Sequence, residues 1–180
     1  MFYKVRDIEI NFKENEIHFP KGYYFKQSPV HHQKVISASE INEVNLNTFP
    51  PSLVYRHNEI IFLDRERKEK LQVFAEQHKI PLADRFDIWE HINEVFLDTE
   101  FEDYQKQNTL RLLYHNGLTF EEVKSIRKKV SKTMSLNLII PIWEWAYLGL
   151  FDYLSWTFLT KKKYWWAMDI GMRNYKTPKS

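Results

Sequence analysis

The chain has 180 residues, with 26 basic and 24 acidic side chains, a formal net charge of +2 and no cysteine. The lack of cysteine excludes disulfides, thiol nucleophiles, thiolate zinc sites and iron–sulfur clusters, and it fits a reducing compartment, so we expect a soluble cytoplasmic protein. Only four glycines occur, and no two lie close together, which excludes the glycine-rich loops of the common nucleotide-binding folds.

The first third of the chain has the pattern of short β-strands. Apolar and polar residues alternate in runs such as residues 8–12 and 16–19, and the breaks between runs contain proline, glycine, asparagine or serine. Residues 53–56 and 59–63 flank His57 and Asn58 and predict a β-hairpin. We expect four to six strands in residues 1–63, mostly antiparallel.

From Asp64 the apolar spacing changes to that of helices. The first predicted helix covers residues 64–79, with Asp64 as its cap and Leu71, Phe74 and Ala75 on its buried side. A second is expected over residues 84–97. Its core-facing stripe comprises Ile88, Trp89, Ile92, Val95 and Phe96.

Two further helices are predicted around a turn at Asn116 and Gly117. The helix over residues 103–115 ends there, because glycine readily adopts the left-handed conformation that closes a helix. Thr119 and Glu122 then have the spacing of a capping box, which predicts a helix start at Thr119. The buried stripe of this helix is expected to comprise Phe120, Val123, Ile126, Val130 and Met134.

These patterns together predict an α+β fold. An N-terminal, mostly antiparallel β-sheet over residues 1–63 is followed by a helical region of four to five helices over residues 64–180, and we expect both to form one compact domain.

Charge is strongly segregated along the chain. Residues 1–63 hold 7 basic and 7 acidic side chains, residues 64–103 hold 6 and 12, and residues 104–180 hold 13 and 5. Asp87, Glu90, Glu94 and Asp98 recur at helical spacing and predict a carboxylate stripe opposite Trp89. Such a stripe is a solvated face, or it binds a basic partner.

A metal site or an enzyme active site is the alternative interpretation of the same segment. Asp87, His91 and Glu94 share a helical face and could bind a cation. The Glu-x-x-His pairs of carboxylate-bridged dimetal bundles are absent from the sequence, however. We therefore expect no cofactor.

The basic counterpart lies on the helix that begins at Thr119. Lys124, Arg127, Lys128 and Lys132 project away from the apolar stripe. Two helices joined by a glycine-containing turn, with exposed cations, match the outline of a helix-turn-helix, so nucleic-acid binding is an alternative function. A plain pair of antiparallel helices has the same pattern, and no side chain indicates readout of bases.

The C-terminal part is rich in apolar and aromatic residues. Residues 136–159 are about long enough to cross a bilayer, but Pro141, Glu144 and Asp152 interrupt them, so we expect a packed helix rather than a transmembrane span. Contact with a membrane surface is left open. Some aromatic side chains of this part, among them Trp143, Trp165 and Trp166, are expected to line a groove or an interface.

No catalytic motif emerges from the sequence. The seven histidines all precede residue 116, and none lies in a nucleophile or metalloprotease motif. The sequence favours a non-enzymatic module that binds another protein. Its predicted partner-binding residues are Asp87, Glu90, Glu94, Asp98, Trp143, Trp165 and Trp166, and self-association is left open.

Overall fold

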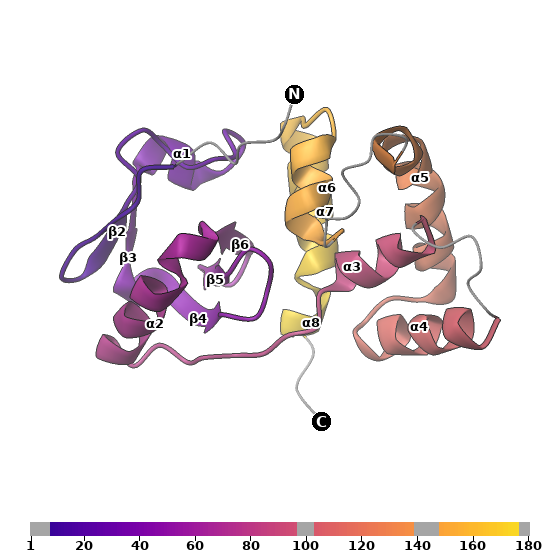
Figure 1. Ribbon diagram of the computed structural model, residues 1–180, viewed down its shortest axis with the longest axis horizontal. Helices are drawn as coiled ribbons and strands as arrows, with labels where there is room; N and C mark the ends of the chain where they lie inside the picture. Colours follow the sequence, from indigo (N-terminus) through magenta and orange to yellow (C-terminus); the bar gives the residue numbers. More distant parts are fainter. Residues whose placement is uncertain (1–7, 97–102, 139–147, 177–180) are drawn as a thin grey trace. The chain divides into compact units, whose positions relative to one another are not determined.

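The computed structural model describes residues 8–96, 103–138 and 148–176, apart from the side chains at 103, 132–138 and 176. Contacts between residues divide the chain into two compact units, with residues up to Arg85 in unit 1 and residues from Phe86 in unit 2 (Figure 1). Whether they unfold as one domain, as the sequence predicts, stays a prediction.

Unit 1 contains two antiparallel sheets of three strands each. The first sheet has the order β1 (Asn11–Phe12), β2 (Glu16–His18), β3 (Val35–Ser37), and the second has the order β4 (Ile41–Asn45), β5 (Ser52–Tyr55), β6 (Glu59–Phe62). Every residue of β5 and β6 is buried, so these two strands form the centre of the unit. The predicted antiparallel strands are confirmed.

The β5–β6 hairpin lies where the sequence predicts it. Tyr55 pairs with Glu59, and the connection turns through left-handed conformations at Arg56 and His57. Non-glycine residues rarely adopt positive φ, and here two in succession reverse the chain.

The described part of unit 1 also contains helices α1 (Pro29–Gln33) and α2 (Lys68–Gln77) and the 3₁₀ turn η1 (Ala38–Glu40). The predicted apolar side of α2 is confirmed, because Leu71, Phe74 and Ala75 are buried. The predicted cap is wrong: Asp64 precedes a short 3₁₀ turn, η2 (Arg65–Arg67), and its side chain makes no capping hydrogen bond.

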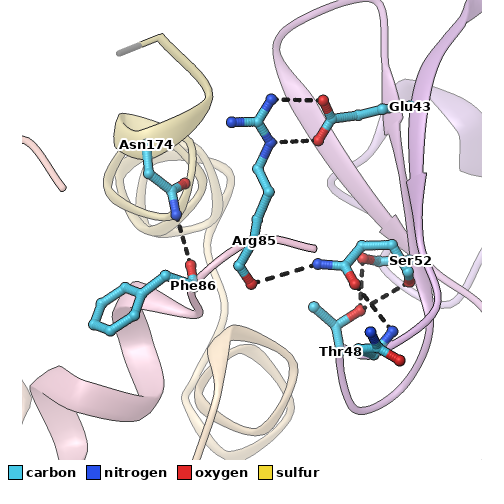
Figure 2. Close-up of polar contacts among 8 residues, drawn as sticks. Glu43, Thr48, Ser52, Arg85, Phe86 and Asn174 are labelled. Carbon is cyan, nitrogen blue, oxygen red and sulfur yellow. Dashed lines mark hydrogen bonds and ion pairs between the residues drawn. The ribbon is translucent and has the colours of Figure 1, made fainter. Parts of the chain in front are cut away.

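The segment between α2 and α3 is extended, including residues 84–87, which the sequence predicts to be helical. The Val44 amide donates to the Pro81 carbonyl over 2.9 Å and the Ala83 amide donates to the Val44 carbonyl over 2.8 Å, so residues 81–83 run beside β4. Arg85 then binds both carboxylate oxygens of Glu43 (Figure 2). These contacts keep residues 84 and 85 out of the helix that the sequence predicts from residue 84.

Unit 2 is entirely helical in its described residues. Its elements are α3 (Ile88–Asn93), η3 (Glu94–Phe96), α4 (Asp103–His115), α5 (Phe120–Leu138), α6 (Leu150–Trp156), α7 (Lys161–Gly171) and α8 (Arg173–Lys176). The helical region therefore contains more and shorter helices than the four to five expected, while the α+β class is confirmed. No helix among the described residues is long and apolar enough to cross a membrane.

The core of unit 2 forms around Trp89. Its ring stacks on Tyr153 at 4.2 Å between centroids and meets the edge of Trp166 at 5.7 Å, and its indole N–H donates to the Ala167 carbonyl. The first and last described parts of the unit are also joined, because the Asn174 amide donates to the Phe86 carbonyl over 2.6 Å (Figure 2). α3 is thus packed against α6 and α7.

The helix start at Thr119 is confirmed. The Glu122 amide donates to the Thr119 hydroxyl and the Thr119 amide donates to the Glu122 carboxylate, over 3.2 and 2.9 Å. Val123, Ile126 and Val130 are buried as predicted. Phe120 is half exposed, so its assignment to the buried stripe is wrong, and Met134 lies outside the described side chains.

Candidate functional site

The predicted acidic stripe does not form as a free surface in the described residues. α3 begins at Ile88, so Asp87 is its N-cap: one carboxylate oxygen accepts from the Trp89 amide over 2.9 Å and from the Glu90 amide over 3.3 Å. The carboxylate also accepts a hydrogen bond from the Leu150 amide in the first turn of α6. Asp87 therefore caps two helices at once.

Gly149 lies directly against the Asp87 carboxylate. A Cβ atom at this position would come within 2.4 Å of Oδ2, which is closer than any non-bonded contact allows. Burial of the carboxylate raises the pKa of Asp87, although the three amide hydrogen bonds oppose this. The close approach of the α6 backbone explains why Asp87 is only partly exposed to solvent.

Glu94 is also engaged inside unit 2. It pairs with the imidazole of His91 at 2.9 Å and accepts a hydrogen bond from the Thr109 hydroxyl of α4. Burial acts to raise the pKa of Glu94, but the hydrogen bonds from His91 and Thr109 outweigh it and hold the pKa below its usual value. The Phe86 ring stacks on the His91 imidazole at 4.1 Å between centroids, so it covers one face of the ring that binds Glu94.

The metal alternative finds no geometric support. Asp87 is occupied by helix amides while His91 and Glu94 bind each other, and no group of three or more histidine or acidic side chains among the described residues could hold a metal ion. Of the predicted acidic set, Glu90 is exposed, and Asp98 lies outside the described residues.

The predicted basic set is split between structural and exposed roles. Arg127 donates to the carbonyls of His91 and Ile92, over 3.0 and 3.1 Å, and so satisfies the C-terminal end of α3. Burial lowers the pKa of Arg127, and the Glu94 carboxylate acts in the opposite direction. Lys124 and Lys128 are exposed, and the Lys132 side chain lies outside the description.

Two of the three tryptophans of the predicted aromatic interface, Trp165 and Trp166, lie in the described residues. Trp166 contacts Trp89 and Tyr153 and carries the ammonium group of Lys129 over its ring at 3.7 Å. Trp165 is half-buried against Tyr164, and Trp143 lies outside the described residues. Trp166 thus takes part in the core of unit 2, and a role in partner binding stays a prediction for all three tryptophans.

A surface on α4 and α5 was missed at the sequence level. The rings of Tyr114 and Phe120 stack at 5.8 Å between centroids, yet 57% of Tyr114 and 50% of Phe120 remain exposed. Four of the seven large apolar side chains that are exposed in the described residues belong to these two helices, namely Tyr104, Leu112, Tyr114 and Phe120. In the sequence, this surface could have been inferred from Phe120, which lies beside the capping Thr119 and at the edge of the predicted apolar stripe of that helix.

Cations border this ring pair along both helices. Arg111 precedes Tyr114 by three residues, and Lys124 and Lys128 follow Phe120 by four and eight, so helical spacing places each on the side of its helix that carries the ring. All three are exposed. We call Tyr114, Phe120, Arg111, Lys124 and Lys128 the α4–α5 patch.

The two helices that carry the patch cross each other instead of lying antiparallel. α4 runs across unit 2 while α5 runs upward from the turn at residues 116–119 (Figure 1). Gly117 adopts a φ of 89° in this turn, as the sequence predicts for the end of α4. The crossing holds the two rings together near the turn and lets the helices diverge beyond it.

In the described part of unit 1, a hollow of about 490 Å³ lies between β1 and α2. It is lined by Phe12, Lys13, Glu14, Glu69, Lys70, Val73, Phe74 and Gln77. Its two lysines and two glutamates show no preference for either charge, so it suggests no class of ligand.

No protein family, curated protein or solved structure matches this chain.

Proposed function

We propose that this chain is a protein-binding module and that its contact surface is the α4–α5 patch. The observation that carries the proposal is the stacked, half-exposed pair of Tyr114 and Phe120. Exposed aromatic rings that are held in a fixed arrangement are typical of the centres of protein interfaces, because they bury a large area at a small cost in side-chain entropy.

The location of the patch differs from the surfaces that the sequence suggested. Asp87 and Glu94 are engaged in helix capping and in contacts with His91 and Thr109, which leaves Glu90 as the exposed carboxylate of the described acidic set. Four of the seven exposed large apolar side chains of the described residues lie instead on α4 and α5. A partner would therefore meet aromatic rings with a basic border.

Photo-crosslinking tests the proposal. With p-benzoylphenylalanine in place of Phe120, we expect a defined protein to be crosslinked in cells that naturally express the chain, and we expect the additional change Tyr114→Ala to abolish the adduct. The matched control carries the same photoreactive residue at Val73, which is 52% exposed and lies in unit 1.

The crosslinked protein must then bind in purified form. Phe120→Ala is expected to weaken its affinity by about tenfold or more, as is usual for a central aromatic contact. Equal crosslinking at positions 73 and 120, or an affinity that is unchanged in Phe120→Ala, would show that the patch is not the interface. A crosslink to a second copy of this chain would identify self-association.

A second candidate function is nucleic-acid binding. The crossing of α4 and α5 at a glycine-containing turn favours it over a plain antiparallel pair of helices, and Lys124 and Lys128 are exposed on the second helix. Against it, the exposed Glu121 lies in the first turn of α5, where a recognition helix approaches the DNA.

Salt-dependent binding distinguishes this candidate. A nucleic-acid-binding protein would retain a fluorescent duplex or single strand at about 0.05 M salt and lose it steeply toward about 0.2 M. The double charge reversal Lys124→Glu and Lys128→Glu would remove that binding. No retention at the lower salt concentration eliminates the candidate.

A further inference from the structure

We infer that the partner bound by the α4–α5 patch offers an acidic segment that carries large apolar side chains. The inference rests on the proposed function and adds the chemistry of the partner to it.

The centre of the patch requires apolar groups from the partner. Tyr114 and Phe120 shield one another on one side only, so about half of each side chain remains in water. Leu110, one helical turn before Tyr114, is half-buried and extends the apolar surface along α4. A partner that supplies only charges would leave these groups hydrated and gain little from them.

The border of the patch is predominantly positive. Arg111 lies on the α4 side and Lys124 and Lys128 on the α5 side, while Glu121 is the exposed carboxylate on the first turn of α5. Three cations against one anion favour carboxylates on the partner and disfavour a basic segment, because like charges across an interface cost free energy.

The border cations are available for such a partner. Within the part of the chain that the structure describes, Arg111, Lys124 and Lys128 form no ion pair, whereas Arg173 pairs with Glu122 and Asp169 and Arg85 pairs with Glu43. Charges without an internal partner are the ones that attract a complementary surface and determine how fast it associates.

Two fluorescent peptides of the same length test the inference. Both carry leucine and phenylalanine at the same helical spacing. All remaining positions are glutamate in one peptide and lysine in the other, so that only charge differs. We expect the full-length protein to bind the glutamate peptide at least about tenfold more tightly than the lysine peptide, and we expect this preference to shrink as salt screens the charges.

Charge reversal on the protein provides the second arm. The double variant Lys124→Glu and Lys128→Glu is expected to lose about tenfold in affinity for the glutamate peptide and to gain affinity for the lysine peptide. The matched control is Lys161→Glu with Lys162→Glu, which makes the same change of charge at two exposed lysines of α7. The control variant should bind as the unchanged protein does.

The outcomes separate this inference from the proposed function. If Phe120→Ala weakens the crosslinked partner but the double reversal at 124 and 128 does not, the patch is the interface and the acidic partner is wrong. Equal binding of the two peptides, or binding of neither, also overturns the inference. Retention of a single-stranded oligonucleotide in place of the peptides would assign the cations to nucleic acid and overturn both proposals.

Discussion

Asp87 shows how one side chain can organise two helices that are distant in sequence. Its carboxylate accepts hydrogen bonds from the Trp89 and Glu90 amides in the first turn of α3 and from the Leu150 amide of α6, and Gly149 leaves just enough room for it. The N-terminal amides of a helix have no partner within the helix, so a buried helix start needs such an acceptor. This requirement explains why a carboxylate tolerates burial here.

Replacing Asp87 by alanine should destabilise unit 2. Two helix starts would lose their acceptor, and we expect the free energy of unfolding to fall by about 1–2 kcal/mol, since the cost of burying the carboxylate offsets part of the capping. Urea unfolding followed by tryptophan fluorescence measures this. Asp84→Ala, at an exposed position outside the helix, is the control. An equal loss in both variants would contradict the capping role.

Tyr153 predicts a dependence of stability on alkaline pH. Burial raises the pKa of its phenol from the usual 10.0 to about 12, while the hydrogen bond with Thr157 acts to lower it. The unfolded chain therefore releases this proton at lower pH than the folded chain does. The contribution of Tyr153 to stability is complete below pH 10 and is lost as the pH rises toward about 12.

The comparison with Tyr153→Phe isolates this contribution. Between pH 10 and about 12 the free energy of unfolding should fall less steeply in the variant than in the unchanged protein, because the variant has no phenol at this position to ionise. Chemical denaturation at a series of pH values gives both slopes. Identical slopes would show that Tyr153 ionises alike in the two states.

At the level of helices and strands, three signals that depend on neighbours in sequence are confirmed, although the cap predicted at Asp64 is not. Thr119 and Glu122 form the capping box, Gly117 ends α4, and His57 lies in the turn between β5 and β6. Each of these features is built from backbone and side-chain groups a few residues apart, so the sequence contains all the participants.

The capping box provides a prediction for α5. Thr119→Ala removes the acceptor of the Glu122 amide and should lower the free energy of unfolding by about 1 kcal/mol, whereas Thr119→Ser retains a hydroxyl and should remain close to the unchanged protein. Thermal or urea unfolding of the three proteins provides the comparison. A serine variant as unstable as the alanine variant would contradict the role of the hydroxyl.

The helix predicted over residues 84–97 begins later than predicted, at Ile88, because residues before it pair with β4 instead. Residues 81–83 hydrogen-bond to Val44 and Arg85 binds Glu43, both on β4. These contacts come from residues about forty positions earlier in the chain, as the Arg85–Glu43 pair illustrates. The apolar spacing of a segment does not show that its first residues will pair with the edge of a strand instead of forming a helix.

At the level of the whole molecule, the contacts divide at Arg85 and Phe86, while the sequence predicts one compact domain. Each unit has its own core, formed around β5 and β6 in the first and around Trp89 in the second. Two cores can unfold separately, or they can unfold together if they stabilise each other.

We expect two unfolding transitions. Five of the six tryptophans lie in residues 143–166 and the sixth is Trp89, so tryptophan fluorescence follows residues 86–180 only. Far-ultraviolet circular dichroism follows both units. Transitions at different urea concentrations by the two probes would confirm independent units, whereas coincident transitions would confirm the single domain that the sequence predicts.

The sequence by itself determined the α+β class, the antiparallel hairpin, the buried sides of α2 and α5 and the capping box, because these depend on periodicity and on groups close together in the chain. Only the tertiary structure decided that Asp87 is a partly buried cap, that Arg127 closes α3 and that Phe120 is half exposed. The physical reason is that periodicity shows which side of a helix is apolar or charged, whereas burial depends on which distant element packs against that side. The charge segregation was visible from the start, but packing assigned Asp87 and Glu94 to internal contacts and left Lys124 and Lys128 on the surface.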